Sequence, residues 1–255
     1  MKFLRVSWQI GDKHQNGFFK TVSAKKGDKL PSTYTFAKQP RQGIGAMFDT
    51  IAHRYDFLNH LLSLGMDRRW RVQGVKALQS AVGRAGASIL DVATGTGDLA
   101  IAALQMKPPL LVGIDVSREM LSLAQKKFFR YSVLTSSGFF VQAAVEHLPI
   151  PSEIFDAAMV AYGVRNFADL QQGLREIHRV LKPGGRFLVI EFSLPKFPVI
   201  RQLYLFYFGK LLPSIGRFFS GSRYAYSYLP ASVEQFPQPE EFVKVLQEVG
   251  FAEVK

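Results

Sequence analysis

The chain has 255 residues, of which 47% are hydrophobic and 20% are charged. This composition is typical of a folded globular protein and excludes a mainly disordered or fibrous chain. The absence of cysteine excludes disulfides, cysteine-ligated zinc, iron–sulfur clusters and thiol catalysis. No apolar run reaches the roughly 18 residues that a transmembrane helix needs. The five histidines show no metal-binding spacing, so we predict no metal site.

Basic residues are concentrated at the amino-terminal end. The chain carries a net charge of +12, and residues 1–45 hold nine Lys or Arg residues against two acidic ones, a local charge of +7. We therefore predict a basic, partly disordered extension over residues 1–45 and a folded domain over 46–255. Such an extension could bind nucleic acid or anionic lipid headgroups. The alternative is a solvated tail.

Apolar spacing predicts two amphipathic helices, one over 46–62 and one from about 67 to 78. After them, short apolar runs alternate with helical patterns. This alternation predicts an α/β fold, with a doubly wound and mostly parallel sheet covered on both faces. The expected strands are 88–93, 110–115, 139–143, 155–161 and 186–192. The other expected elements are helices at 98–106, from 117, at 170–181 and at 239–249, a turn at 182–185, and a strand starting at 251–255.

A glycine-containing turn, Asp91-Val-Ala-Thr-Gly-Thr-Gly-Asp98, follows the first predicted strand. In a doubly wound sheet, ligands bind beyond the carboxyl ends of the strands at this place. Glycines there let the backbone approach a ligand closely. The turn departs from the strict dinucleotide motif GxGxxG, because Ala100 stands at the third glycine position.

Asp115 ends the second predicted strand, twenty residues after Gly95. A carboxylate at this spacing can accept hydrogen bonds from both ribose hydroxyls of a nucleoside. The alternative is an acid that caps the following helix. Together with the glycine turn, Asp115 favours a nucleoside site. Since no GxxxxGK motif occurs, S-adenosylmethionine fits better than a nucleoside triphosphate.

Several motifs give the chain a resemblance to a known family. The sequences DVATGTGDLA, GIDVSREML, FDAAMVAYGVRNF and HRVLKPGGRFLVIEFS resemble the class I S-adenosylmethionine-dependent methyltransferases, and more narrowly the ubiquinone/menaquinone biosynthesis C-methyltransferases. The segment from Tyr55 to Asn59 and the segment from Arg179 to Ser193 are similar to that family's two signatures. The resemblance covers about residues 46–255. It implies a Rossmann-like fold with a helical amino-terminal cap and an aromatic helical insertion before the last helix.

The sequence departs from the family pattern at several positions. Asp67 stands where the family usually has histidine, and Leu58 where it has methionine. Ala144 and Val145 replace an Asn-Ala pair near the adenine, so we expect backbone groups to contact the base there. The family continues past Lys255 into one more strand, and we therefore expect the chain to lack the final strand of the sheet, which would leave an open edge.

The resemblance implies transfer of a methyl group from S-adenosyl-L-methionine to a ring carbon of a quinol. Arg165 and Asn166 are the expected catalytic residues. The guanidinium of Arg165 stays protonated and cannot accept a proton, so we expect Arg165 to stabilise a developing phenolate by its charge rather than to act as the base. Tyr55 is expected at the site as a substrate contact or a core aromatic, and Asp56 is an alternative base. The residues expected to bind the cofactor are Asp91, Thr94, Gly95, Thr96, Gly97, Asp98, Asp115, Val116, Ala144, Val145 and Ala161.

Residues 197–219 are unusually aromatic, with Arg and Lys interspersed. They could be core packing, but an interfacial element that admits an isoprenoid tail fits better. We thus expect an enzyme that is cytoplasmic, in peripheral contact with the inner face of the membrane, able to form a homodimer, and not bound to nucleic acid. The expected substrate is demethylmenaquinol. The alternatives are a 2-polyprenyl-6-methoxy-benzoquinol of ubiquinone biosynthesis, another small molecule, and, in a different class, a non-catalytic nucleic-acid-binding protein.

Overall fold

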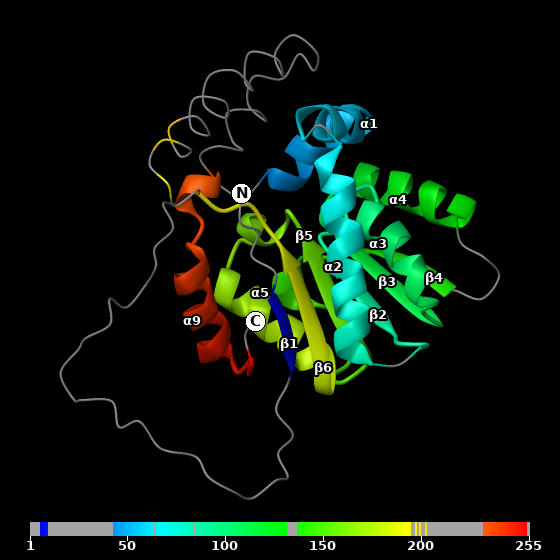
Figure 1. Cartoon of the computed structure of the whole chain (residues 1–255). Helices are drawn as coiled ribbons and strands as arrows, with labels where there is room; N and C mark the ends of the chain where they lie inside the picture. The colour runs from blue at the N-terminus through cyan, green and yellow to red at the C-terminus, as the bar shows by residue number, and fades with distance from the viewer. Residues whose placement is uncertain are drawn as a thin grey trace, which may run out of the picture.

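A computed structural model describes residues 6–9, 43–63, 65–83, 85–131, 137–194 and 232–253, with the isolated positions 197, 199 and 202. Its centre is a six-stranded sheet in the order β1-β6-β5-β2-β3-β4 (Figure 1). The strands from β2 to β6 run parallel, and β1 pairs antiparallel with β6. The strand bounds are β1 Val6–Gln9, β2 Ile89–Val92, β3 Leu110–Asp115, β4 Ser137–Gln142, β5 Phe155–Ala161 and β6 Leu181–Ile190.

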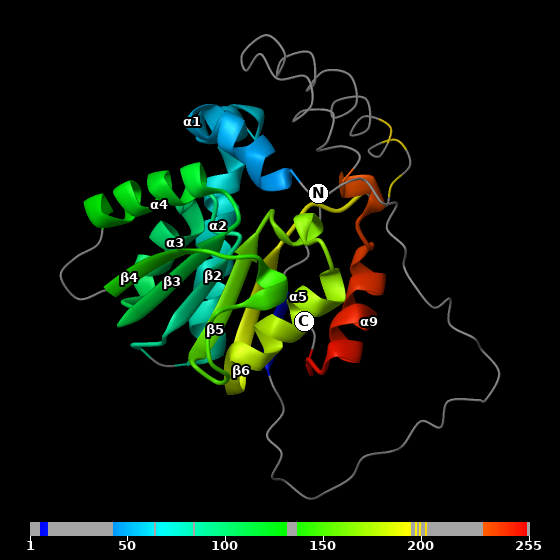
Figure 2. The same ribbon diagram turned by 180° about the vertical axis from the view of Figure 1, so that it is seen from behind.

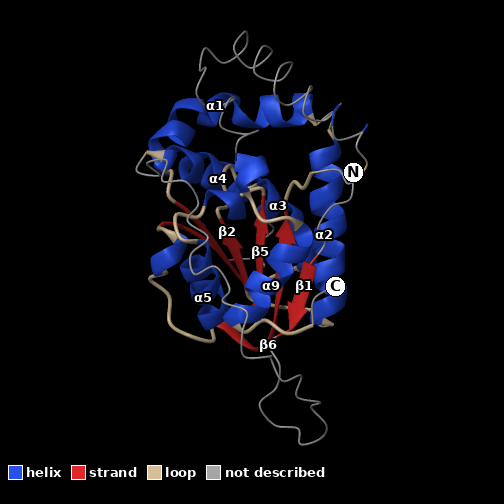
Figure 3. Ribbon diagram, turned by 90° about the vertical axis from the view of Figure 1, so that its left-hand side faces the viewer, coloured by secondary structure: helices blue, strands red, loops and turns tan. Residues whose placement is uncertain are grey.

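Helices cover both faces of the sheet, which confirms the predicted doubly wound α/β fold. Figures 1 and 2 show α2, α3 and α4 on one face and α5 and α9 on the other. In Figure 3, α1 crosses above one end of the sheet, as the predicted helical cap should. The helix bounds are α1 Ile44–Leu62, α2 Met66–Val82, α3 Asp98–Ala103, α4 Arg118–Tyr131, α5 Leu170–Val180 and α9 Pro239–Val249, with short 3₁₀ helices η1 Leu104–Met106, η2 Val145–His147 and η3 Val164–Asn166.

Two buried apolar layers hold the helices to the sheet. Successive side chains of a strand point to opposite faces, so neighbours in β2 enter different layers. Leu90 packs in the layer that contains α5 and α9, with Leu174 and Phe242. Ile89 packs in the layer beneath α2 and α3, with Leu78 and Leu99. None of the described helices is long and apolar enough to cross a membrane.

The predicted turn at 182–185 lies inside β6 as a bulge. The pairing with β5 passes from Phe155↔Leu181 to Ala157↔Arg186, so residues 182–185 have no partners in β5. Gly184 has φ +78°, a conformation that favours glycine. The strand expected from 251 is reduced, among its described residues, to a single bridge at Ala252. The aromatic insertion lies outside the described residues except at 197, 199 and 202.

The strand β1 was not foreseen. It belongs to the segment predicted as an extension, yet Val6 pairs with Val189 and Gln9 with Arg186. It therefore covers the outer edge of β6, an edge that the sequence led us to expect open. The rest of residues 1–42 lies outside the described part of the chain, and the division at residue 45 stays a prediction.

Candidate active site

A cavity of about 250 Å³ lies where four parallel strands end and α1 passes over them. Its floor follows the sheet order: Val145 after β4, Asp115 at the end of β3, Gly95 after β2 and Gly163 after β5. The first turns of α1 close the opposite side, through residues such as Phe48. The cavity thus sits at the edge of the sheet where the sequence predicted a nucleoside.

The glycine turn after β2 has a backbone conformation that lets a ligand come close to the main chain. Gly95 and Gly97 have φ values of +56° and +85°, and Ala93 has +50°. The Thr94 hydroxyl donates to Asp91 Oδ2 at 2.6 Å, which ties the turn to its own strand. Since Gly95 has open space where a Cβ would stand, this backbone can face a ligand.

Asp115 combines the two roles that the sequence left open. Its Oδ1 accepts from the Ser117 amide at 2.9 Å, beside the start of α4, and its Oδ2 accepts from the Gly95 amide at 2.8 Å. It also borders the cavity. Because a carboxylate oxygen has two lone pairs, each oxygen can still accept from a ribose hydroxyl. Burial raises the pKa of Asp115 above its ordinary value.

Asp91 lies beneath the glycine turn. It is buried, and its Oδ1 has no hydrogen-bond partner among the described residues. Burial raises its pKa to about 7. A buried carboxylate oxygen without a partner is costly, and a cationic or donor group of a ligand would relieve that cost.

The wall near β4 is assembled from backbone-rich loops. Ala144 and Val145 border the cavity, as expected, and η2 begins there. Glu146, which also borders it, accepts from the amides of Ala168 at 2.5 Å and Asp169 at 3.1 Å. These bonds join the loop after β4 to the loop before α5.

The predicted catalytic residues separate into two pairs. Tyr55 and Asn166 border the cavity, whereas Arg165 and Asp56 do not. Tyr55 meets Phe48 edge-on with 5.9 Å between ring centroids, and burial raises the pKa of its phenol. Arg165 is ion-paired with Glu191, a buried acid one residue past β6.

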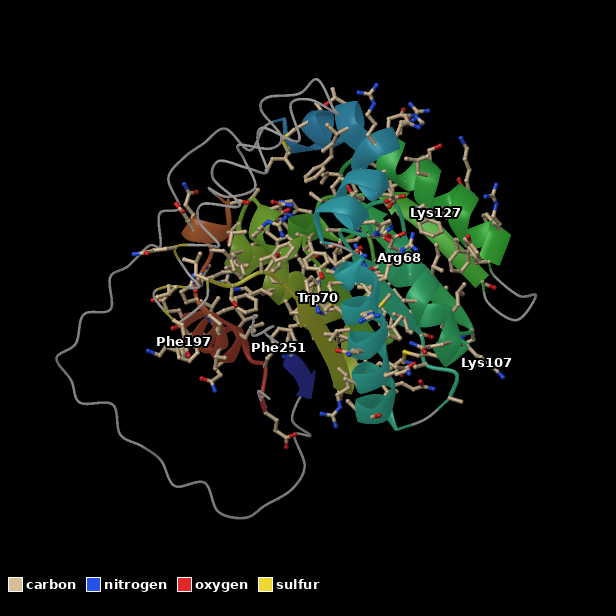
Figure 4. All side chains as sticks on the ribbon, turned by 45° about the horizontal axis from the view of Figure 1, so that its top comes forward. Arg68, Trp70, Lys107, Lys127, Phe197 and Phe251 are labelled. Carbon is tan, nitrogen blue, oxygen red and sulfur yellow. The ribbon has the colours of Figure 1, made fainter. Side chains whose placement is uncertain are left out.

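Asp56 belongs to a network of charges that fastens α1 and α2 to the glycine turn. It accepts from the Thr96 hydroxyl and is ion-paired with Lys127. The Lys127 ammonium also donates to Asp98 at 2.8 Å. Figure 4 shows Lys127 on α4, beside α1. Thr96 and Asp98, predicted as cofactor contacts, are thus held by this network.

The network continues to His60, Asp67 and Asp98, whose ligand atoms lie within 4.8 Å of one another, close enough for a metal ion. The guanidinium of Arg71 already pairs with Asp67, and its Nη1 lies 3.6 Å from Asp98. His60 Nδ1 is 2.8 Å from Asp67. The cluster is internally compensated, and the absence of a metal site stays a prediction.

The cavity therefore collects part of the predicted cofactor set. The members of that set that border the cavity are Gly95, Asp115, Val116, Ala144, Val145 and Ala161. The other five, Asp91, Thr94, Thr96, Gly97 and Asp98, are not part of the lining. Sequence reasoning missed the residues that α1 and the loops contribute. Of these, Tyr162 had a signal, since it stands between the end of a predicted strand and the GVRN motif. The missed lining residues include Ile44, Gly45, Phe48, Met120, Glu146, Tyr162 and Phe167.

Comparison with known proteins points to one family. A sequence model of the ubiE/COQ5 methyltransferase family matches residues 35–255. The chain is 48% identical over 212 residues to the demethylmenaquinone methyltransferase of Chlorobaculum parvum, covering 83% of this chain and 85% of that protein. It is 46% identical over 214 residues to the ubiquinone/menaquinone biosynthesis C-methyltransferase UbiE of Geotalea uraniireducens, covering 83% and 89%.

Solved structures share the fold at low identity. An S-adenosylmethionine-dependent methyltransferase from Thermotoga maritima aligns with a TM-score of 0.53 at 22% identity, covering 81% of this chain and 82% of that one. The [4+2]-cyclase SpnF aligns with a TM-score of 0.55 at 22% identity, covering 82% and 72%. These likenesses concern the fold alone.

Proposed function

The chain belongs to the ubiE/COQ5 methyltransferase family, and on that premise we propose that it methylates a ring carbon of a prenylated quinol in respiratory quinone biosynthesis. It is an S-adenosylmethionine-dependent methyltransferase. We favour demethylmenaquinol as substrate because the Chlorobaculum parvum relative, at 48% identity, is named for that activity. A benzoquinol of ubiquinone biosynthesis is the second candidate, since the UbiE relatives carry both quinones in their name. We do not propose the alternative of a non-catalytic nucleic-acid-binding protein, because the chain belongs to a family of methyltransferases.

The residues around the cavity fit the cofactor. The glycine turn offers open backbone at Gly95, Asp115 has lone pairs left for ribose hydroxyls, and Asp91 has a buried oxygen without a partner in the described part of the chain. We propose that Asp115 holds the ribose and that the loop at Ala144 and Val145 contacts the adenine. Thr94, Thr96, Gly97 and Asp98 would shape the turn from behind.

For the reaction to proceed, the protein must stabilise the deprotonated quinol, the quinolate. S-adenosylmethionine supplies an electrophilic methyl group when bound. A quinol ring carbon becomes strongly nucleophilic only when the neighbouring hydroxyl loses its proton. We propose that the positive charge of Arg165 stabilises the quinolate and that Asn166 orients its oxygen or a water that carries the proton away. The observation that carries this proposal is that Asn166 and Tyr55 border the same cavity as Gly95 and Asp115.

Asp56 takes a different role in this proposal. Its carboxylate is engaged by Thr96 and Lys127 and does not border the cavity. We propose that it positions α1 over the glycine turn. Asp56 as the base stays the alternative to this positioning role.

Contact with a membrane surface is part of the proposal, because a prenylated quinol resides in lipid. Phe197 and Val199, at the start of the aromatic segment, are 70% and 69% exposed; Figure 4 labels Phe197. We propose that this segment touches the cytoplasmic face of the membrane. Co-sedimentation with anionic vesicles should fall in a Phe197→Ser, Val199→Ser variant.

A homodimer is also proposed, through the free edge of the sheet. Phe139 and Val141 on β4 and Phe129 and Tyr131 on α4 are exposed, and β4 has no neighbour on its outer side among the described strands. An uncharged edge strand favours pairing with another copy. Light scattering should report a dimer for the natural chain and a monomer for Phe139→Lys; a monomer in both cases would contradict this.

Methyl transfer to defined quinols tests the main proposal. The purified full chain is incubated with S-adenosylmethionine that carries a deuterated methyl group and with a short-tailed demethylmenaquinol or demethyl-benzoquinol. Mass spectrometry should find the label on the naphthoquinol ring. Label only on the benzoquinol would show that the substrate is the benzoquinol of ubiquinone biosynthesis. Label on neither quinol would contradict the proposed function. Asp115→Ala serves as a variant with impaired cofactor binding.

A further inference from the structure

Tyr162 carries a buried hydroxyl that nothing in the described part of the chain satisfies. Its Oη has no hydrogen-bond partner among the described residues, although the side chain is buried and the residue borders the cavity. A buried polar group without a partner costs the free energy of its lost hydration. Because the unsatisfied atom belongs to a residue that borders the cavity, a ligand that enters the cavity is the natural partner to complete its hydrogen bonding.

The ring of Tyr162 is held firmly in place. It stacks on Phe192 with 4.7 Å between ring centroids and an interplanar angle of 22°. On its α2 side, the guanidinium carbon of Arg71 lies 5.3 Å from the centroid of the Tyr162 ring. The backbone is fixed as well, since its amide donates to the Ile190 carbonyl at 2.8 Å and its carbonyl accepts from Arg165 at 2.6 Å. The hydroxyl therefore cannot readily turn to another partner.

The order of the strands indicates which part of a ligand reaches Tyr162. With the ribose at Asp115 on β3 and the adenine toward Val145 after β4, the remainder of the cofactor must extend the other way. In the sheet order β4-β3-β2-β5, that direction leads past Ala93 after β2 to Tyr162 after β5. The part of S-adenosylmethionine on that side of the ribose is its amino-acid chain.

The chemistry of two unpartnered atoms matches the charges of that chain. Burial raises the pKa of the Tyr162 phenol, so the hydroxyl keeps its proton and can donate. Asp91 Oδ1, on the neighbouring strand β2, is an acceptor that no described residue satisfies. An α-amino acid is a zwitterion, with a carboxylate that needs donors and an ammonium that needs acceptors. Arg71 adds positive charge on the side of Tyr162.

We propose that Tyr162 is a cofactor-binding residue, whose hydroxyl donates a hydrogen bond to the α-carboxylate of the amino-acid end of S-adenosylmethionine, with Asp91 beside the ammonium. The inference rests on the cofactor site described under the proposed function. It assigns to Tyr162 selection for the amino-acid end, which the ribose and adenine contacts cannot provide.

Two nucleosides separate this role from a general one. S-adenosylhomocysteine has the amino-acid end, and 5′-methylthioadenosine has the same adenosine and sulfur without it. In calorimetry with the full chain, Tyr162→Phe should weaken S-adenosylhomocysteine on the order of 10- to 100-fold, the range for losing a hydrogen bond to a charged group. The affinity for 5′-methylthioadenosine should change less than about twofold, since Tyr162→Phe removes only the oxygen.

Controls and stability complete the test. Tyr131→Phe makes the same chemical change at an exposed tyrosine on α4 and should alter neither affinity. Without ligand, Tyr162→Phe should unfold at the same or a higher temperature, because an unsatisfied buried hydroxyl has been removed. An unchanged affinity for S-adenosylhomocysteine, or an equal loss for both nucleosides, would overturn the role given to Tyr162 and leave the proposed function standing. If the natural chain bound neither nucleoside, the cofactor site itself would fall, and this inference with it.

Discussion

The guanidinium of Arg165 is ion-paired with the carboxylate of Glu191, with 2.5 Å between Nη1 and Oε1, and the two side chains are only 6% and 1% exposed. The same carboxylate oxygen accepts from the Phe192 amide at 2.9 Å. The pair joins the turn after β5 to the segment after β6. The charge proposed to stabilise a quinolate is thus already positioned by a buried acid.

Removing the acid from this pair should destabilise the protein. Glu191→Gln leaves the buried guanidinium without that counter-ion, a change that typically costs about 3–5 kcal/mol. Urea unfolding measures the free energy of unfolding. Replacing both residues by Met should recover most of the loss, because no buried charge then remains. A Glu191→Gln variant within about 0.5 kcal/mol of the natural chain would show that the pair contributes little.

Two substitutions of Arg165 distinguish an electrostatic stabiliser from a base. Arg165→Lys keeps the positive charge and should retain part of the methylation rate, whereas Arg165→Gln loses the charge and should raise the barrier by about 2.7–4 kcal/mol. Both should bind S-adenosylhomocysteine with nearly natural affinity in calorimetry. A Gln variant with the natural rate would remove Arg165 from catalysis.

Asp91 should make stability depend on pH. Burial raises its pKa from the ordinary 3.8 to about 7. The folded state then binds more protons than the unfolded state across this window, so the free energy of unfolding should fall as pH rises from about 4 to 7. Asp91→Asn cannot ionise and should flatten this slope. Urea unfolding at several pH values compares the two proteins, and equal slopes would show that Asp91 ionises normally.

Lys127 should couple the cap to the cofactor turn. Lys127→Met removes its bonds to Asp98 at 2.8 Å and Thr96 at 3.1 Å and its pairing with Asp56. Since these groups are partly exposed, the loss of stability should be only about 1 kcal/mol. Affinity for S-adenosylhomocysteine should fall as well, because Asp56 and Asp98 then repel each other. Lys126→Met, an exposed neighbour on α4, should change neither quantity.

Gly163 permits a close approach at the floor of the cavity. A Cβ at this position would stand 2.6 Å from the Cβ of Ala93. Gly163→Ala should therefore force the ends of β2 and β5 apart and cost about 1–3 kcal/mol, with weaker cofactor binding. Adding Ala93→Gly removes the opposing atom and suits the φ of +50° at that residue. Thermal unfolding of the single and double variants checks this; no recovery in the double variant would contradict the clash.

Local patterns were sufficient for much of the fold. The apolar runs around Ile89, Leu111 and Ala158 read as strands because a buried parallel strand is apolar on both faces. The glycine turn and Asp115 were recognised by their spacing, and the structure places Gly95 and Asp115 at one cavity. The helix over 46–62 was predicted from its spacing, and the structure begins it at Ile44.

The partners of charged residues were not predictable in the same way. Lys127 lies 29 residues from Asp98 and 71 from Asp56, and no sequence signal connects them. The strand β1 pairs with β6 across most of the chain. Its four residues, Val6–Gln9, alternate apolar and polar, but the run is too short to predict a strand or its partner from sequence.

By itself, the sequence determined the α/β class, the glycine turn, Asp115 and the family, because these depend on backbone preferences and residue types within short segments. Only the tertiary structure decided that Arg165 pairs with Glu191, that Asp56 pairs with Lys127 and does not border the cavity, and that Tyr162, which does border it, keeps a buried hydroxyl that no described residue satisfies. The physical reason is that a side chain's partner depends on which strands are neighbours and which helix face packs on them. That choice maximises the buried apolar surface and minimises the buried unpaired charge of the whole chain rather than of any one segment.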